Sequence, residues 1–278
     1  MIFLSLLQLF LRLPAETMAL VSLNSNSNSN SNQHNHPYPT TRRLTLDNGK
    51  EIPIRSRLVP LTSSWNVTIW ELDQPADIMS HYWSVSQQTQ QQTLDPFGLV
   101  LWPGSVVAAQ TMLQLQARLK GKTILIVGAG PGVEAQAAAM LGAKSVLATD
   151  IHPTTLQLLR YGAQQTGLDK IIHEQVFDLC SETPLPDCDI LVVADVLYSE
   201  KLARHVGKRC LEALHRGNCI MVADSQRLAD FVPQINTHLN KPLTWKEQTL
   251  EAFTGSGVMI NEDQTYDIKT RVLTAGEW

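Results

Sequence analysis

Three glycines and one aspartate have the types and the spacing of a nucleotide-binding site. Gly128, Gly130 and Gly132 alternate directly after the apolar run at residues 124–127, and Asp150 lies twenty-two residues beyond the first of them. Glycine lets the chain turn tightly and bring its N–H groups close to a ligand. An acid that ends the following strand accepts hydrogen bonds from ribose hydroxyls in doubly wound sheets. We therefore expect a nucleotide-containing ligand at these four residues.

Two further groups of polar side chains also follow strand-like segments. Asp178 comes after the strand expected at residues 171–176, and Asp195 and Tyr198 come after the one expected at residues 189–194. The second segment is a nearly unbroken apolar run, which indicates a central strand buried on both faces. Open α/β sheets bind ligands at the carboxyl ends of such strands, so we expect Asp195 and Tyr198 at the same site. The position of Asp178 by itself is that of a turn-forming residue.

The elements around these residues predict an α/β fold. Residues 133–141 are rich in alanine and predict a helix that ends at Gly142, and residues 145–149 predict the next strand. Strand, glycine turn, helix and strand form the first half of a nucleotide-binding sheet. Residues 243–250 and 266–274 have the pattern of a closing antiparallel pair. We predict a Rossmann-like seven-stranded sheet with right-handed crossovers, helices on both faces and a small N-terminal β addition.

Two classes of cofactor bind to this architecture. Dinucleotide sites need G-x-G-x-x-G/A, because a small sixth residue permits close packing of helix and strand, and Val133 is in that position here. Residues 142–150, GAKSVLATD, instead resemble the second motif of S-adenosylmethionine-dependent methyltransferases with a seven-stranded sheet. S-adenosyl-L-methionine is therefore the expected cofactor, and a nucleotide-dependent oxidoreductase is the alternative.

A segment before the glycine turn makes the resemblance narrower. Residues 95–104, DPFGLVLWPG, precede a helix expected at residues 105–119, for which Ser105 is the expected N-cap. An aromatic residue followed by L-W-P and a helix resembles the family 16 lysine methyltransferases, most closely the branch that contains the electron-transfer-flavoprotein β-subunit lysine methyltransferase. The resemblance covers roughly residues 94–230.

The resemblance implies a set of cofactor-binding residues. Trp102 would pack beside the cofactor, although it would equally serve as a core tryptophan that anchors the following helix. Asp178 would reach the adenine amino group. The implied cofactor-binding residues are Trp102, Gly128, Gly130, Gly132, Asp150, Ile151, Asp178 and Asp195.

One position departs from the family pattern. The family usually has an acid two residues before the first glycine of the turn, and this chain has Ile126 there. What that acid does for the methionine end of the cofactor must come from another residue or be weaker.

The function implied by the resemblance is methyl transfer to a lysine ε-amine of a protein. Asp195 and Tyr198 match the acid-x-x-Tyr motif of the family and are the candidate catalytic residues. Asp195 would hydrogen-bond the incoming amine, and Tyr198 would form a wall of the lysine channel. Alternatively, Asp195 caps the next helix and Tyr198 packs on its first turn. Only the first interpretation predicts that Asp195→Asn lowers turnover and leaves stability unchanged.

Other functions remain as alternatives. The chain could be a small-molecule N-methyltransferase, a non-catalytic binding module or the oxidoreductase already named. Its 278 residues carry a net charge of −4, which argues against general nucleic-acid binding. The four cysteines have no C-x-x-C spacing, so we expect reduced thiols and no metal site. No segment is long enough to span a membrane, and the oligomeric state is left open.

Composition divides the chain into three parts. We expect a disordered or targeting tail at residues 1–43, a β extension with a Gln-rich connector at residues 44–93, and the methyltransferase domain at residues 94–278. The expected location is cytoplasmic, or a mitochondrion or plastid if the apolar N-terminus is a targeting segment.

Overall fold

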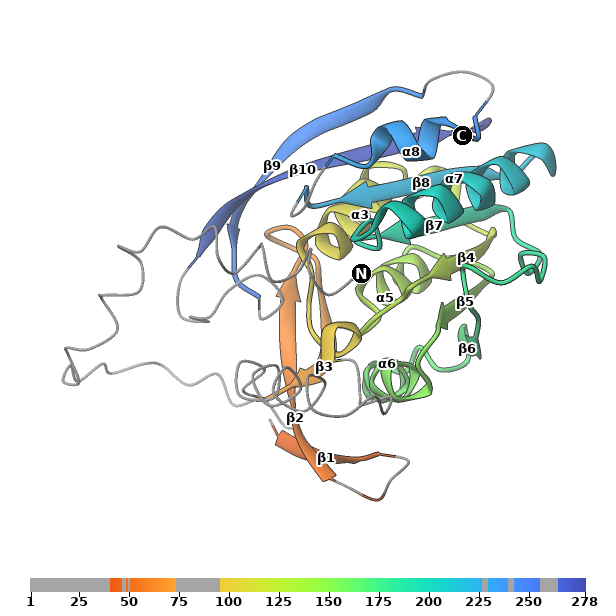
Figure 1. Cartoon of the computed structure of the whole chain (residues 1–278). Coiled ribbons are helices and arrows are strands. Elements are labelled where there is room, and N and C mark those ends of the chain that lie inside the picture. Colours follow the sequence, from red (N-terminus) through yellow and green to blue (C-terminus); the bar gives the residue numbers. More distant parts are fainter. Residues whose placement is uncertain are drawn as a thin grey trace, which may run out of the picture. The chain divides into compact units, whose positions relative to one another are not determined.

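The central sheet has seven strands among the described residues, in the order β6-β5-β4-β7-β8-β10-β9 (Figure 1). Five neighbouring strands are parallel, and β10 runs antiparallel to both β8 and β9. The strands are β4 (Thr123–Val127), β5 (Ser145–Asp150), β6 (Ile172–Val176), β7 (Ile190–Ala194), β8 (Cys219–Asp224), β9 (Trp245–Phe253) and β10 (Tyr266–Ala275). This confirms the predicted mixed sheet of seven strands.

The chain is represented by a computed structural model that describes residues 41–46, 49, 51–73, 96–226, 230–239, 243–255 and 265–278. All of these lie in one unit, Thr40–Trp278. The Gln-rich connector and nearly all of the predicted tail lie outside the described residues. The targeting interpretation and the cytoplasmic location therefore stay predictions.

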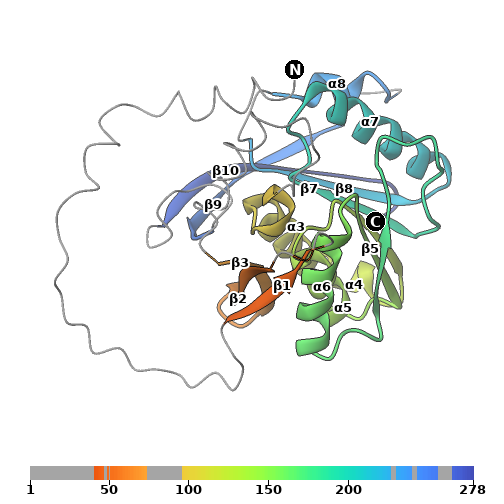
Figure 2. The same cartoon turned by 60° about the horizontal axis from the view of Figure 1, so that its bottom comes forward.

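Helices cover both faces of the sheet, as expected (Figure 2). They are η2 (Pro96–Leu99), α3 (Pro103–Gln114), α4 (Gln116–Leu119), α5 (Val133–Met140), α6 (Pro153–Gln165), α7 (Glu200–His215) and α8 (Val232–Asn236). Alternate residues of β4 face opposite layers: Ile124 and Ile126 join the core beside α3, α5 and α6, whereas Leu125 and Val127 join the core beside α7. A parallel strand covered on both faces needs apolar residues on both faces, and the buried residues 124–127 of β4 are all apolar.

A second, three-stranded sheet is the predicted N-terminal addition. It consists of β1 (Thr41–Thr45), β2 (Glu51–Pro60) and β3 (Asn66–Leu72), all antiparallel. The first strand begins at Thr41, before the boundary expected at residue 44.

Strand β3 covers α5 and α6. The Gln136 side chain on α5 donates to the Thr68 carbonyl oxygen at 2.6 Å, and the Trp70 indole donates to Gln165 on α6 at 2.7 Å. Helix α5 is therefore buried almost all round, which explains why its residues are nearly all small or apolar.

The helix expected at residues 105–119 differs from the prediction. Helix α3 begins at Pro103 with Trp102 as its N-cap, so Ser105 is not the cap. Proline suits the first position of a helix, because its fixed φ is already helical and its missing N–H would have no partner there. The helix also stops at Gln114, because Leu115 leaves helical geometry, and α4 follows as a separate turn.

Candidate functional site

The glycine turn needs glycine for two physical reasons. Gly128, Gly130 and Gly132 have φ angles of 72°, 51° and 92°, in the left-handed region that glycine adopts without strain. A Cβ at Gly128 would also lie 2.5 Å from Cγ1 of Val196. The N–H groups of Gly128 and Ala129 both donate to the Thr149 carbonyl oxygen at 2.9 Å, which fixes the turn against the end of β5.

Asp150 joins this turn, as the sequence predicts. Its carboxylate is nearly buried, and it accepts hydrogen bonds from the N–H of Gly130 at 3.3 Å and the N–H of His152 at 3.0 Å. The turn and the acid, twenty positions apart, therefore form one unit at the carboxyl edge of the sheet.

Apolar side chains are exposed at the ends of the two strands beside this unit. Ile151, directly after β5, is 52% exposed, and Val176, the last residue of β6, is 53% exposed. Asp150 pairs with Val176 in the register of β5 and β6, so these two exposed apolar side chains lie at neighbouring strand ends beside the acid.

Asp178 is exposed beyond the end of β6. Its carboxylate accepts a hydrogen bond from the N–H of Cys180 at 2.7 Å. This is the contact of the turn-forming alternative. A contact with adenine stays a prediction.

Trp102 is held by the segment before α3. Its indole N–H donates to the Phe97 carbonyl oxygen at 2.7 Å, and its ring stacks on that of Phe97 with centroids 6.3 Å apart. Because Trp102 is also the N-cap residue of α3, it anchors this helix, as one of its two interpretations predicts. It is only partly buried, so a cofactor contact stays a prediction.

Asp195 links the ends of three elements. It follows β7 with a left-handed φ of 52°, and its side chain is 5% exposed. One carboxylate oxygen accepts from the N–H of Gly104 at 2.6 Å, in the first turn of α3, and the other accepts from the N–H of Ser225 at 2.8 Å, after β8. A positive φ is uncommon outside glycine, and such backbone strain clusters at functional sites.

The expected alternative for Asp195, a cap on the next helix, is wrong. Ser199 caps α7, because its hydroxyl oxygen accepts from the N–H of Leu202 at 3.2 Å. Asp195 instead caps α3, which precedes it in the chain by ninety-one positions. Tyr198 lies between them in sequence and is 38% exposed.

Comparison with known proteins decides the family. The family model described as "Lysine methyltransferase" matches residues 84–238, more than half of the chain.

The chain belongs to the lysine methyltransferase family.

Several relatives of this family member act on proteins, according to their names. The ribosomal protein L11 methyltransferase of Dichelobacter nodosus is 31% identical over 159 residues, which are 54% of this chain and 52% of that protein. The electron transfer flavoprotein beta subunit lysine methyltransferase of Mus musculus is 31% identical over 111 residues, 39% of this chain and 42% of that protein. The chain thus spans about half the length of the relatives it matches.

Solved structures resemble the family member more distantly. A putative S-adenosylmethionine-dependent methyltransferase from Streptococcus mutans aligns with 87% of this chain and 57% of its own, at 14% identity and a TM-score of 0.47. The strand order, rather than this likeness, defines the fold.

One residue of the site was missed by the sequence analysis. Glu134 lies in the first turn of α5, two positions after Gly132, and is completely buried. Neither carboxyl oxygen has a partner in hydrogen-bond geometry among the described residues, although the Ser105 side chain and the Glu134 backbone N–H lie near enough to affect its pKa. Burial raises the pKa of Glu134 to about 7, a net value that the Ser105 side chain and the Glu134 backbone N–H lower in part and that the charge of Asp195 raises slightly. An acid in an alanine-rich helix directly after the glycines, in a chain with Ile126, was the available signal.

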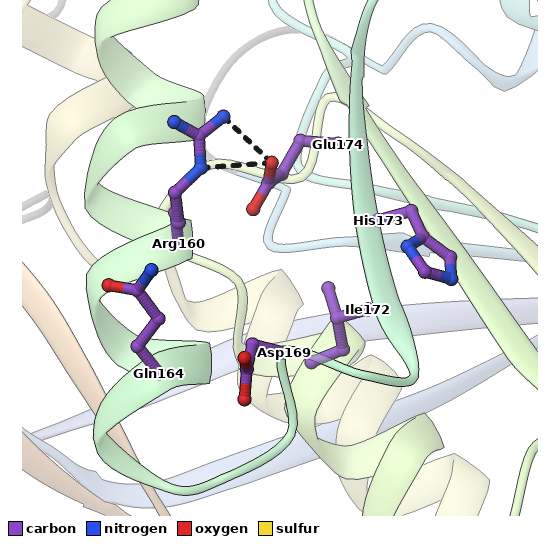
Figure 3. A pocket seen from close by; sticks show the side chains of 6 residues that line it. All are labelled: Arg160, Gln164, Asp169, Ile172, His173 and Glu174. Carbon is purple, nitrogen blue, oxygen red and sulfur yellow. Dashed lines mark hydrogen bonds and ion pairs between the residues drawn. The ribbon is translucent and has the colours of Figure 1, made fainter.

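The family member also has a polar groove at the outer edge of the sheet. Residues of α6 and β6 line about 350 Å³, and the Arg160 guanidinium pairs with Glu174 across it at 2.9 Å (Figure 3). None of the predicted site residues lines this groove.

Within the described ranges, no three His, Cys, Asp or Glu side chains gather as a metal site would require. In the same part of the chain, no helix has both the length and the apolar character needed to cross a bilayer.

Proposed function

We propose that this chain transfers methyl groups from S-adenosylmethionine to a lysine side chain of a protein. The observation that supports this best is the glycine turn bound to Asp150 at the carboxyl edge of the sheet, in a member of the lysine methyltransferase family. Two relatives are named for protein substrates, a flavoprotein subunit and a ribosomal protein. Because the aligned segments cover about half of each relative, substrate and activity are proposed for this chain rather than transferred to it.

The residues at this edge fit the cofactor. A Cβ on Gly130 would meet only the Gly98 carbonyl oxygen, at 3.8 Å, among the described atoms within 4 Å, so the turn has open space on that side. The exposed Ile151 and Val176 offer apolar surface next to the Asp150 carboxylate. An acid beside an apolar surface suits a ribose joined to a flat base.

Each residue would then hold one part of the cofactor. Asp150 would accept from the ribose hydroxyls, Ile151 and Val176 would contact the adenine ring, and the glycine turn would accommodate the amino-acid end. S-adenosylmethionine supplies a methyl group carried on a positively charged sulfur.

The chain must also position a neutral amine. A lysine loses its proton more readily when it is desolvated, so a closed channel favours the reactive form. Each oxygen of Asp195 already accepts one backbone N–H, and a carboxylate oxygen has lone pairs for a further hydrogen bond. We propose that Asp195 orients the amine in this way and that the exposed Tyr198 ring contacts the lysine stem.

A labelling experiment tests the function. The purified chain is incubated with S-adenosylmethionine that carries a tritiated methyl group and with a cell lysate, and labelled proteins are mapped to residues by mass spectrometry. We expect label on lysine in a small number of proteins, and none with the Asp150→Ala variant. Label confined to the small-molecule fraction would replace the protein substrate with a small amine. Absence of cofactor binding at millimolar concentration would overturn the proposal.

A further inference from the structure

Glu134 is a buried acid without a neutralising partner. It lies in the first turn of α5, where Ser105 in the first turn of α3 and the charged Asp195 act on it. Its side chain is 0% exposed, and both of its oxygens lack a hydrogen bond within the described part of the chain. Burying a carboxyl group in this way is costly, so its presence calls for a ligand or a function.

The elements packed against α5 do not supply a cation aimed at Glu134. Helix α3 and strand β4 carry no titratable residue. The titratable groups on β3, β5 and β6 are Glu71, paired with Arg55 and Arg57; Asp150, bonded to two backbone N–H groups; His173; and Glu174, paired with Arg160. Asp195 beyond β7 is negative and opposes ionisation. None of these elements therefore supplies a cation to Glu134 among the described residues, so a positive charge beside it would have to come from a ligand.

Glu134 lies close to position 126, where the family usually has an acid and this chain does not. Ile126 stands where the family usually has an acid, and it faces the α3 and α5 side of the sheet. It belongs to the same core cluster as Val133 and Ala135, the two neighbours of Glu134. An acid at position 126 and the acid at position 134 would thus lie in the same layer beside the glycine turn.

We propose that Glu134, the buried acid beside the glycine turn, supplies the negative charge missing at position 126 when the positively charged cofactor is bound. The proposal rests on the proposed cofactor. Glu134 is a positioning residue in this scheme, since its negative charge attracts the cationic end of the ligand. In the fraction of the free protein in which Glu134 is protonated, the proton leaves for the solvent on binding, so the acid is negative beside the positively charged cofactor.

The proposal predicts how the affinity for the cofactor depends on pH. With a pKa of about 7, Glu134 is ionised in the free protein above pH 7, and below it binding must first remove a proton. Cofactor affinity therefore falls with decreasing pH, by about tenfold between pH 8 and pH 6. The amino group of the cofactor titrates too, but it does so equally with every variant of the protein.

Calorimetry measures the proton directly. The full chain is titrated with S-adenosylmethionine at pH 6, 7 and 8 in two buffers of different ionisation enthalpy. The variants are Glu134→Gln and, as a matched control, Glu182→Gln, an exposed acid that pairs with Lys208 on the surface. For the wild type and the control we expect release of about half a proton at pH 7 and the tenfold loss of affinity.

The Gln variant should behave differently in both respects. It should release no proton through this group, bind about tenfold more weakly than wild type at pH 8, and bind about equally at pH 6. The outcome that overturns the proposal is a Gln variant with the proton release and pH profile of wild type. If the wild type itself does not bind the cofactor, the proposed function fails instead, so the two failures are distinguishable. Cooperative melting confirms that each variant is folded.

Discussion

At the scale of single residues, the site is built from acids whose oxygens are tied to the backbone. Asp150 accepts from Gly130 and His152, and Asp195 accepts from Gly104 and Ser225. Such bonds orient a carboxylate before any ligand arrives, so less ordering remains to be done on binding.

Asp150→Ala should weaken cofactor binding by on the order of 2–4 kcal/mol, because two charge-assisted hydrogen bonds to the ribose are lost. The variant should also melt at a lower temperature, because the N–H groups of Gly130 and His152 lose their acceptor. Titration calorimetry on the folded variant measures the first effect. An unchanged dissociation constant would remove Asp150 from the site.

Asp195→Asn should lower both turnover and stability. The amine-orienting interpretation predicts unchanged stability, and the structure corrects this. An amide NH₂ cannot accept the N–H of Gly104 or Ser225, so one buried donor loses its partner at a cost of about 1–3 kcal/mol. Turnover per folded molecule decides the catalytic role, and we expect a loss on the order of a hundredfold from poor alignment. Near wild-type turnover by the folded fraction would make Asp195 purely structural.

Glu134→Gln should change how stability depends on pH. The pKa of Glu134 rises from 4.5 to about 7 on folding, so the folded state holds a proton that the unfolded state has lost between these values. Stability of the wild type therefore falls as the pH rises from about 4.5 to 7, by about 3 kcal/mol, and is level above. Denaturant unfolding of the variant should lack this fall. Parallel curves for the two proteins would show that Glu134 is not buried as described.

At the scale of elements, α3 is positioned from the carboxyl end of β7, a strand of the sheet on which it packs. Its first turn has no side-chain cap of its own, and Asp195 caps it from the end of β7. A Cβ on Gly104 would lie 2.6 Å from the Asp195 carboxyl carbon, so only glycine permits this approach.

Two substitutions compare the cap of α3, which lies at the site, with the cap of α7, which stabilises only that helix. Gly104→Ala should force Asp195 and α3 apart, lower the free energy of unfolding by about 1–3 kcal/mol and weaken cofactor binding. Ser199→Ala removes the cap of α7 and should cost about 1 kcal/mol with cofactor affinity unchanged. Chemical denaturation and calorimetry on both variants make the comparison. Equal cofactor affinities in the two variants would contradict the role given to α3.

At the scale of the whole molecule, the N-terminal sheet belongs to the core of the domain. Glu71 on β3 is fully buried, pairs with Arg55 and Arg57 of β2, and accepts the N–H of Leu101 at 3.2 Å just before α3. Strand β3 also covers α5 and α6. The sheet thereby supports the helices that form one side of the site.

Truncation tests this support. Removing residues 1–39, the unit outside Thr40–Trp278, should leave melting temperature and cofactor affinity nearly unchanged. Removing residues 1–73 exposes the buried faces of α5 and α6 and should abolish soluble, cooperatively melting protein. A soluble, cofactor-binding protein from the longer truncation would show that the sheet is an accessory.

The sequence by itself determined the sheet, the glycine turn and the place of Asp150. These depend on local patterns: apolar runs that demand burial on both faces, glycines that permit positive φ, and an acid at a strand end. It also placed Asp195 and Tyr198 at the carboxyl edge, because parallel strands end together.

Only the tertiary structure decided what the acids contact. Asp195 reaches Gly104 across ninety-one positions, and Glu134 is buried because α3 and β3 close over α5. Neither the Asp195–Gly104 contact nor the burial of Glu134 can be predicted from the nearby sequence. Helix propensity and the spacing of apolar residues are the same whether or not another helix packs on the one in question. The partner of a buried polar group is set by packing between distant segments. For this reason the sequence shows the missing acid at Ile126 and an unusual acid at Glu134, but not that Glu134 is buried against α3.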